Sequence, residues 1–395
     1  MKLRVLFVSD DEDDIRIGAV KAPHRLAEAL EADGCECTLL FHEDLGRWPA
    51  RERLRLALAP WLAWRAVCRA WRERGPFDVI DAAGAEGFAL GLLRRVSCYR
   101  GAALVVRSHG LDRFYLAGLV ADHRAGLLRK PWHRRILYHC TRVLPEAAAY
   151  RRADAAIVLN RAEERLLAPR TRHVRTIAHG VLRSRLAEAP PAGSPRGGGI
   201  LFSGTWHTGK GIHYLAEAYR RLRARGVDAP LTLLSGMEEG AEFEKEENWI
   251  RSYFAPQCQA GLTVLRRSHD QDAVFALYRS HDLLVCPSST EGFGMVVLEA
   301  LSQRLPVVCS RAAGAAELLE DGGNALLVPA RDAAALAGAL ERLWLDSALR
   351  QSLAENGYAR VTELTWRHAA AATQETYREA RRATLAAGSP QRSMP

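Results

Sequence analysis

The chain has 395 residues, of which 48% are hydrophobic and 26% are charged. This composition is that of a globular protein and argues against wholesale disorder, a collagen-like repeat and a disulfide scaffold. The formal net charge of +9 favours acidic partners such as phosphates, anionic lipids or nucleic acid. Because a single core stops growing near about 250–300 residues, we expect about two domains.

The sequence shows neither a membrane-spanning segment nor a metal motif. No apolar run approaches the roughly 20 residues that a spanning helix needs, and the apolar stretch at the N-terminus is too short for a signal-peptide core. The eight cysteines are scattered, without CxxC or His-paired spacing. We therefore expect reduced thiols and a cytoplasmic location.

Short apolar runs rich in β-branched residues recur along both halves of the chain. They lie at 3–10, 37–44, 78–84, 103–110, 155–160 and 175–180, and again at 199–204, 231–236, 262–267, 283–289, 306–311 and 325–329. Runs of this kind that alternate with longer helical stretches indicate buried parallel strands in βαβ units. The pattern predicts an α/β protein with two doubly wound, Rossmann-like domains that face a cleft.

The boundary between these domains is marked by a segment rich in proline and glycine, 188–199, which we interpret as a hinge. We place the N-terminal domain at residues 1–190 and the C-terminal domain at residues 191–364. A terminal helix is predicted over 365–385.

Small, polar or glycine residues follow several predicted strands. They are Ser108-His109-Gly110, Ser203-Gly204-Thr205, Ser235-Gly236 and the segment 287–291. Any one of these is most simply an ordinary turn. Because doubly wound sheets bind ligands at the carboxyl ends of their strands, their recurrence indicates a ligand-binding edge.

The most informative segment is 282–301. A buried strand ends at Pro287, a loop with Gly292 and Gly294 follows, and a helix starts near Gly294. Helix N-termini bind anions, and glycine lets the backbone approach a phosphate closely. Glu291 lies in the loop and Glu299 further along the helix, so these carboxylates can accept hydrogen bonds from sugar hydroxyls on either side of a diphosphate.

This segment resembles the Glu-x7-Glu signature of retaining glycosyltransferases with the GT-B fold, specifically glycosyltransferase family four. GTWHTGKG at 204–211 is similar to the family's glycine-rich loop, and VVRSHGLD at 105–112 to its strand-end His-Gly. Two departures stand out. Thr205 occupies the position where the family usually has arginine, and the first loop, 10–26, lacks the usual run of glycines.

The resemblance implies a retaining, hexosyl-type glycosyltransferase that moves a sugar from a nucleotide diphosphate to an unidentified acceptor. The catalytic residues it implies are Glu291, His109 and Lys210. The donor-binding residues it implies are Gly204, Thr205, Lys210, Gly236, Glu291, Gly292, Phe293, Gly294, Met295, Val296 and Glu299. In the family, the terminal helix crosses back to the N-terminal domain.

Neither a cofactor nor a metal is expected, because Lys210 and helix N–H groups would supply the positive charge that the leaving diphosphate needs. The acidic run at 10–14 is interpreted as a solvated loop. The donor could be linked to UDP, GDP or ADP, and the acceptor could be a saccharide, a lipid-linked sugar or a small molecule. A nucleotide-sugar epimerase and a catalytically silent nucleotide-sugar-binding protein remain open alternatives.

Residues 47–75 form a basic, tryptophan-rich segment. They contain eight arginines, two glutamates and four tryptophans, a net charge of +6. One interpretation is a helix that packs its tryptophans on the sheet with its arginines outward. The other is peripheral docking on an anionic membrane, which such a composition also fits. No nucleic-acid partner is expected, because no recognised nucleic-acid module accompanies the segment.

Overall fold

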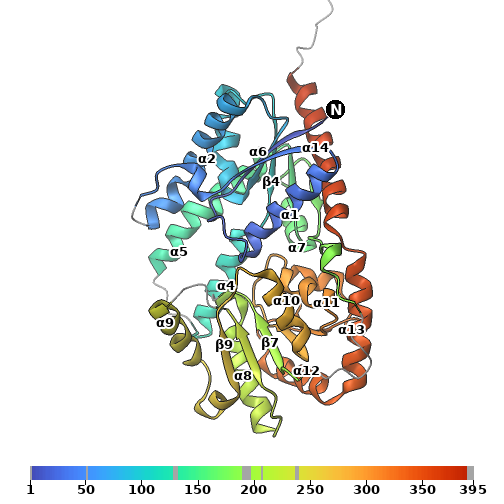
Figure 1. The fold of residues 1–395 in the computed structure, drawn as a ribbon. Helices are drawn as coiled ribbons and strands as arrows, with labels where there is room; N and C mark the ends of the chain where they lie inside the picture. Colours follow the sequence, from blue (N-terminus) through green and yellow to red (C-terminus); the bar gives the residue numbers. More distant parts are fainter. Residues whose placement is uncertain are drawn as a thin grey trace, which may run out of the picture. The chain divides into compact units, whose positions relative to one another are not determined.

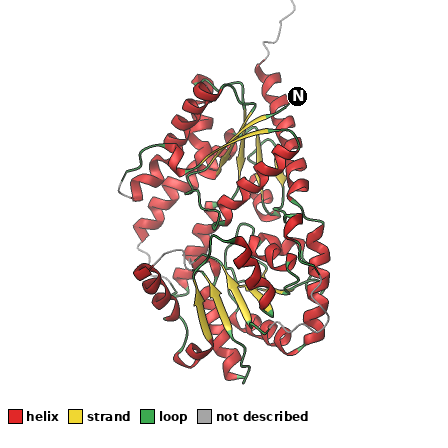
Figure 2. Cartoon of the chain, viewed as in Figure 1, coloured by secondary structure: helices red, strands yellow, loops and turns green. Residues whose placement is uncertain are grey.

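The protein is described from a computed structural model (Figure 1), which describes residues 2–49, 52–127, 132–188, 197–205, 208–235 and 240–388. The chain divides into two compact units. Unit 1 comprises residues 1–117, 129–179 and 366–395, and unit 2 comprises residues 118–128 and 180–365. Each unit contains its own β-sheet flanked by helices (Figure 2).

The sheet of unit 1 is parallel, with strand order β2-β1-β3-β4-β5-β6. Its strands are β1 (Arg4–Val8), β2 (Glu36–Leu40), β3 (Val79–Ala83), β4 (Ala103–Arg107), β5 (Ala155–Val158) and β6 (Val174–Thr176). The helices of this unit are α1 (Gly18–Ala32), α2 (Glu52–Arg74), α3 (Gly87–Leu93), α5 (Trp132–Tyr138), α6 (Leu144–Arg152), α7 (Arg161–Leu167) and α14 (Trp366–Gly388), and α4 (Asp112–Arg124) begins here. The three strands β3, β4 and β5 are buried throughout, which explains their mainly apolar sequence.

The sheet of unit 2 is also parallel, with strand order β12-β11-β10-β7-β8-β9. Its strands are β7 (Ile200–Ser203), β8 (Leu231–Leu234), β9 (Leu262–Leu265), β10 (Leu283–Cys286), β11 (Val307–Ser310) and β12 (Leu326–Val328). Its helices include α8 (Ile212–Ala224), α9 (Gly240–Arg251), α10 (Gln271–Ser280), α11 (Met295–Ser302), α12 (Ala333–Leu345) and α13 (Ser347–Thr362). A short 3-10 helix, η6 (Thr208–Lys210), precedes α8.

Each apolar run predicted as a strand overlaps one of these strands, and the prediction of two Rossmann-like α/β domains is confirmed. Parallel strands need crossover connections, and helices supply them on the faces of each sheet. The domain boundary differs from the predicted one. The units divide at 179/180 and not at 190/191, and 189–196 of the predicted hinge lie outside the described residues.

The terminal helix α14 belongs to unit 1, where it packs on α1, β4 and β5. A buried polar contact fixes it there. Tyr377 donates a hydrogen bond of 2.5 Å to Asp81 Oδ2, and Arg107 Nη2 donates to the same oxygen over 2.7 Å. All three side chains are buried, and a buried ion pair whose lone pairs are not satisfied would be costly. The contact therefore specifies where the last helix docks.

The basic segment forms α2, and most of its tryptophans are structural. Trp48 and Trp64 donate indole hydrogen bonds to the His42 carbonyl and the Ser97 hydroxyl, over 2.8 and 3.0 Å. Trp71 packs against the rings of Phe77 and Tyr99 in the core of unit 1. The packing interpretation thus accounts for these three tryptophans. The fourth, Trp61, packs edge-on against Phe88, with ring centroids 6.1 Å apart, but remains 38% exposed.

Candidate functional site

The candidate site lies at the carboxyl edge of the unit 2 sheet, where two loops meet. One loop, 204–211, follows β7, and the other, 287–294, follows β10. Backbone hydrogen bonds join them, because the N–H groups of Ser289 and Thr290 donate to the Gly209 carbonyl over 2.8 and 3.1 Å. The strands β7 and β10 are neighbours in the sheet, so the fold unites two segments about eighty residues apart in sequence.

Glycine is required where each of these loops ends and the following helix begins. Gly211 has a φ of +75°, and a Cβ there would lie 1.9 Å from the Pro287 carbonyl oxygen. Gly294 has a φ of +90° and is the N-cap of α11, which begins with no side-chain cap and no acidic residue in its first turn. The positive end of the α11 dipole therefore faces the loop that carries Glu291.

Lys210 and Glu291 form an ion pair in this loop pair. Lys210 Nζ lies 2.5 Å from Glu291 Oε2, and the two side chains are 20% and 14% exposed. Ser288 donates a second hydrogen bond, of 3.1 Å, to the same carboxylate oxygen. The two residues assigned by resemblance to phosphate and sugar are thus in direct contact. An anionic ligand would compete with Glu291 for the Lys210 ammonium.

Glu299 lies on α11, 7% exposed, and its carboxylate is held by a residue that the sequence analysis missed. Tyr278 on α10 donates a hydrogen bond of 3.0 Å to Glu299 Oε2 and lies 3.2 Å from the Ser203 hydroxyl oxygen. Burial and the Glu299 charge raise the pKa of Tyr278, so the phenol remains protonated and donates. Tyr278 fits the apolar face of an amphipathic helix, which is why sequence periodicity marks it as a core residue only.

The other predicted donor-binding residues surround this pair. The Gly204 N–H donates to the Leu234 carbonyl over 3.1 Å, which ties the glycine-rich loop to β8. Phe293 is buried, and Met295 and Val296 form the first turn of α11. Gly236 lies outside the described residues.

His109 belongs to unit 1, whereas the other described site residues belong to unit 2. It directly follows β4. Its Nδ1 atom is buried with no hydrogen-bond partner in the described part of the chain. Burial lowers the pKa of His109, so the imidazole is neutral at neutral pH.

An arginine ties the start of the acidic first loop to two carboxylates outside it. Arg142 lies 3.0 Å from Asp10, and it also pairs with Glu86 and Asp112 over 2.7 and 3.1 Å. Burial raises the pKa of Glu86 well above its usual range. Across the described residues, no group of three His, Cys, Asp or Glu side chains could hold a metal ion.

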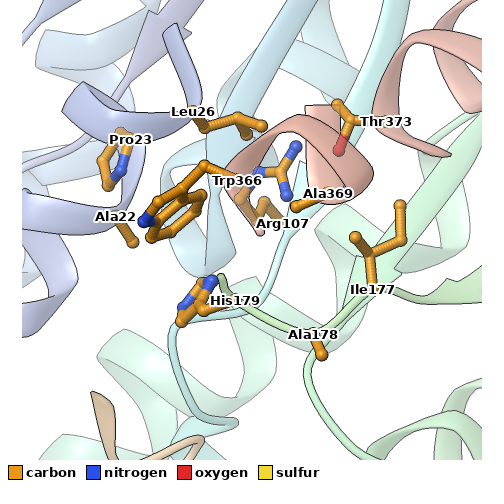
Figure 3. Close-up of a pocket in the computed structure, with 10 residues that line it drawn as sticks. All are labelled: Ala22, Pro23, Leu26, Arg107, Ile177, Ala178, His179, Trp366, Ala369 and Thr373. Atoms are coloured by element: carbon orange, nitrogen blue, oxygen red, sulfur yellow. The ribbon is translucent and has the colours of Figure 1, made fainter. Parts of the chain in front are cut away.

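Unit 1 contains a small cavity (Figure 3). Its lining includes Arg107, His179, Trp366 and Thr373, and it has room for about one water molecule. His179 and Trp366 lie against each other, with ring centroids 5.3 Å apart. Burial lowers the pKa of His179 to about 3, so it stays neutral. A cavity of this size suits a buried water, bound to the Thr373 hydroxyl, which has no hydrogen-bond partner among the described residues.

Comparison with known families identifies the domain that carries the two loops. Residues 196–360 match the family model described as "Glycosyl transferases group 1", and this range contains Lys210, Glu291 and Glu299. Residues 196–360 form a group 1 glycosyltransferase domain. The described helices include none that is long and apolar enough to cross a membrane.

Related proteins match mostly over part of their length. The D-inositol 3-phosphate glycosyltransferase of Arthrobacter sp. (strain FB24) is 30% identical over 200 residues, which is 50% of this chain and 46% of that protein. The glycogen synthase of Mycobacterium tuberculosis (strain CDC 1551 / Oshkosh) is 29% identical over 220 residues, 55% of this chain and 51% of that protein. The chain thus spans about half the length of the curated relatives it matches.

Solved structures resemble nearly the whole chain. Sucrose-phosphate synthase from Thermosynechococcus elongatus aligns with a TM-score of 0.76 and 23% identity, over 98% of this chain and 100% of that one. Anabaena HepE in complex with UDP and glucose aligns with a TM-score of 0.64 and 18% identity, over 95% and 99%. The predicted GT-B fold is confirmed by these alignments.

Proposed function

We propose that the protein is a retaining glycosyltransferase that moves a hexose from a nucleotide diphosphate sugar to an unidentified acceptor. The observation that carries this proposal is the Lys210–Glu291 pair beside the α11 N-terminus, with Glu299 held on the same helix. A cation, a helix dipole and two carboxylates are the groups that a sugar diphosphate requires. The UDP and glucose complex of HepE, a protein of the same fold, supports such a donor.

The chemistry we propose is dissociation of the diphosphate with electrostatic help. Lys210 and the α11 N–H groups would neutralise the charge that develops as the bond to the anomeric carbon breaks. Glu291 would hold hydroxyls of the donor sugar, and Glu299 those of the ribose. His109 of unit 1 is assigned to the sugar and β-phosphate through its resemblance to the family's strand-end histidine. The acceptor hydroxyl would attack the anomeric carbon from the face that the diphosphate leaves, and its proton would pass to the departing diphosphate oxygen.

This proposal includes no metal and no cofactor, because protein groups supply the positive charge. The group 1 relatives favour transfer over the epimerase alternative. Thr205 leaves the loop without one cation that the family usually has, which is the feature that keeps a silent binding protein as the second candidate.

An assay of donor turnover tests the proposal. The protein is incubated with UDP-, GDP- and ADP-linked hexoses and a panel of sugar, lipid-linked and small-molecule acceptors, with and without EDTA. We expect acceptor-dependent release of nucleoside diphosphate that chelation leaves unchanged, with the product in the anomeric configuration of the donor. Activity lost in EDTA and restored by Mg²⁺ or Mn²⁺ would contradict the charge assignment. If none of the donors were turned over, the silent binding protein would be favoured.

We also propose that α2 makes peripheral contact with an anionic membrane. Leu54, Leu58 and Trp61 are 48%, 40% and 38% exposed, and their spacing places them on one stripe of the helix. Exposed arginines, including Arg65 and Arg69, continue the same face toward the end of the helix. A helix face that is apolar in one part and basic in the next fits the surface of an anionic bilayer.

Sedimentation with lipid vesicles tests this contact. We expect binding to vesicles that contain phosphatidylglycerol, weaker binding at high salt because exposed charges are screened, and none to neutral vesicles. Replacing Leu54, Leu58 and Trp61 by serine should abolish it. The control is Leu345→Ser, since Leu345 is 69% exposed but lies on α12 of unit 2. Equal loss in the control, or equal binding to both vesicle types, would rule the stripe out.

A further inference from the structure

Two buried polar side chains at the carboxyl ends of β8 and β9 have atoms without hydrogen-bond partners. Ser235 is 0% exposed and Arg267 is 5% exposed. In the part of the chain that the structure describes, neither Ser235 Oγ nor Arg267 Nε has a partner. The two strand ends are adjacent, because Ser235 N donates to the Leu265 carbonyl over 3.0 Å.

Such groups are not ordinary core residues. Buried polar atoms in native proteins are nearly always hydrogen-bonded, and a guanidinium almost never lies in a core unless it is paired. An arginine whose Nε is unpaired among the described residues therefore indicates an acceptor from outside them, such as a ligand. This arginine lies at the sheet edge that carries the candidate site, where doubly wound folds bind ligands.

The order of the strands gives the position of Arg267 relative to the rest of that site. Lys210 and Glu291 lie in the loops after β7 and β10, and the strands β8 and β9 continue the sheet on the other side of β7 (Figure 1). The Tyr278–Glu299 contact joins to Ser203 at the end of β7.

The order of these residues along the sheet edge corresponds to the order of the parts of a nucleotide. If Lys210 binds the diphosphate and Glu299 the ribose, the next group along the molecule is the base. A base at the ends of β8 and β9 would meet Ser235 and Arg267. This step rests on the proposed function, since only a nucleotide donor has these parts in this order.

We propose that Arg267, with Ser235, recognises the base of the donor and selects one that carries a carbonyl oxygen, uracil or guanine, over adenine. A guanidinium has only N–H donors, and it matches the carbonyl oxygens of uracil or the O6 and N7 acceptors of guanine. Adenine places an amino group where those bases have an oxygen. Its N–H donors would oppose those of Arg267.

Calorimetric titration of the full chain with UDP, GDP and ADP tests this assignment. We expect UDP or GDP to bind the wild-type protein about ten- to hundred-fold more tightly than ADP. Arg267→Gln should weaken binding of the preferred nucleotide by about the same factor and leave the affinity for ADP unchanged. Arg266→Gln is the matched control, because Arg266 is the preceding residue and is exposed. It should alter none of the three affinities.

The outcomes separate this inference from its alternatives. Equal weakening of all three nucleotides by Arg267→Gln would place Arg267 on a phosphate and overturn the base assignment. Equal binding of the three by the wild type would overturn it as well, while leaving the proposed function intact. Binding of none would overturn both.

Melting temperatures without nucleotide give a second readout. Because Arg267 Nε has no hydrogen-bond partner among the described residues, its loss should not destabilise the free protein, and Arg267→Gln should melt at or above the wild-type temperature. A lower melting temperature would indicate a structural role and contradict the proposal. In the titrations, Ser235→Ala, which removes one hydroxyl, should reduce the difference in affinity between the preferred nucleotide and ADP. An unchanged difference would remove Ser235 from the base site.

Discussion

Lys210→Ala should reduce donor turnover by about 10²–10³-fold, the usual effect of removing one preorganised group that stabilises charge in a transition state. The ammonium of Lys210 lies 2.5 Å from Glu291 at the N-terminus of α11, so it is placed where the leaving diphosphate would acquire charge. The measurement is the rate of nucleoside diphosphate release at saturating donor. A rate within about threefold of wild type would show that the helix N-terminus alone carries the leaving group.

A matched control is Lys245→Ala. Lys245 also pairs with a glutamate, Glu242, but it is 70% exposed on α9, and exposed ion pairs contribute little. We expect this variant to keep wild-type turnover. The double variant Lys210→Ala/Glu291→Gln should lose less than the two single variants combined, because directly paired residues are not independent. Additive losses would indicate that the ion pair has no role in the reaction.

Glu299→Ala should weaken nucleotide binding, whereas Glu291→Ala should mainly slow turnover. Glu299 would hold the ribose in ground and transition states alike, so its loss should cost about 1.5–3 kcal/mol for free nucleoside diphosphate and full donor. Of the parts of the donor, Glu291 would contact the sugar, and in the free protein it pairs with Lys210. Its variant should therefore bind free nucleotide at least as tightly as the wild type and turn over slowly. The measurements are binding curves for nucleotide and nucleotide sugar, with rates, in both variants.

Tyr278→Phe makes the same prediction more specific. It removes one hydrogen bond to Glu299 and keeps the ring, so binding should weaken by about 1 kcal/mol, less than in Glu299→Ala. The control variant is Glu341→Ala. Glu341 lies on α12, outside the two loops, and pairs with Arg225. If Glu291→Ala abolished free-nucleotide binding and Glu299→Ala left it intact, the two roles would be reversed. If neither changed binding or rate, the segment would be scaffold.

The local pattern of the sequence predicts the secondary structure and fold class of this protein well. Strands such as β4 and β10 are buried on both faces, so each appears in the sequence as a short apolar run, bounded by the polar or glycine residues of the sheet edge. The glycines at 211 and 294 mark the loops for the same local reason, because each requires a positive φ. The family resemblance then assigns roles to Lys210, Glu291 and Glu299 by their spacing.

The sequence leaves open the partners of these residues, because contacts between distant segments depend on how helices and strands pack. Tyr278 and Glu299 meet only because α10 and α11 pack together, and Lys210 meets Glu291 only because β7 and β10 are adjacent. The tryptophans of the basic segment 47–75 show the same limit. Composition alone fits both a membrane helix and a packed one, and burial distinguishes Trp48, Trp64 and Trp71 from the exposed Trp61.

The sequence by itself therefore determined the α/β class, the order of strands and helices, and the two loops with their lysine and glutamates. These follow from the periodicity of burial and from backbone angles, which each residue expresses locally. Only the tertiary structure decided that Tyr278 holds Glu299 and that Ser235 and Arg267 lie buried with unpaired atoms at the same sheet edge. Whether a buried polar atom has a partner depends on every segment packed around it, and no single stretch of sequence contains that information.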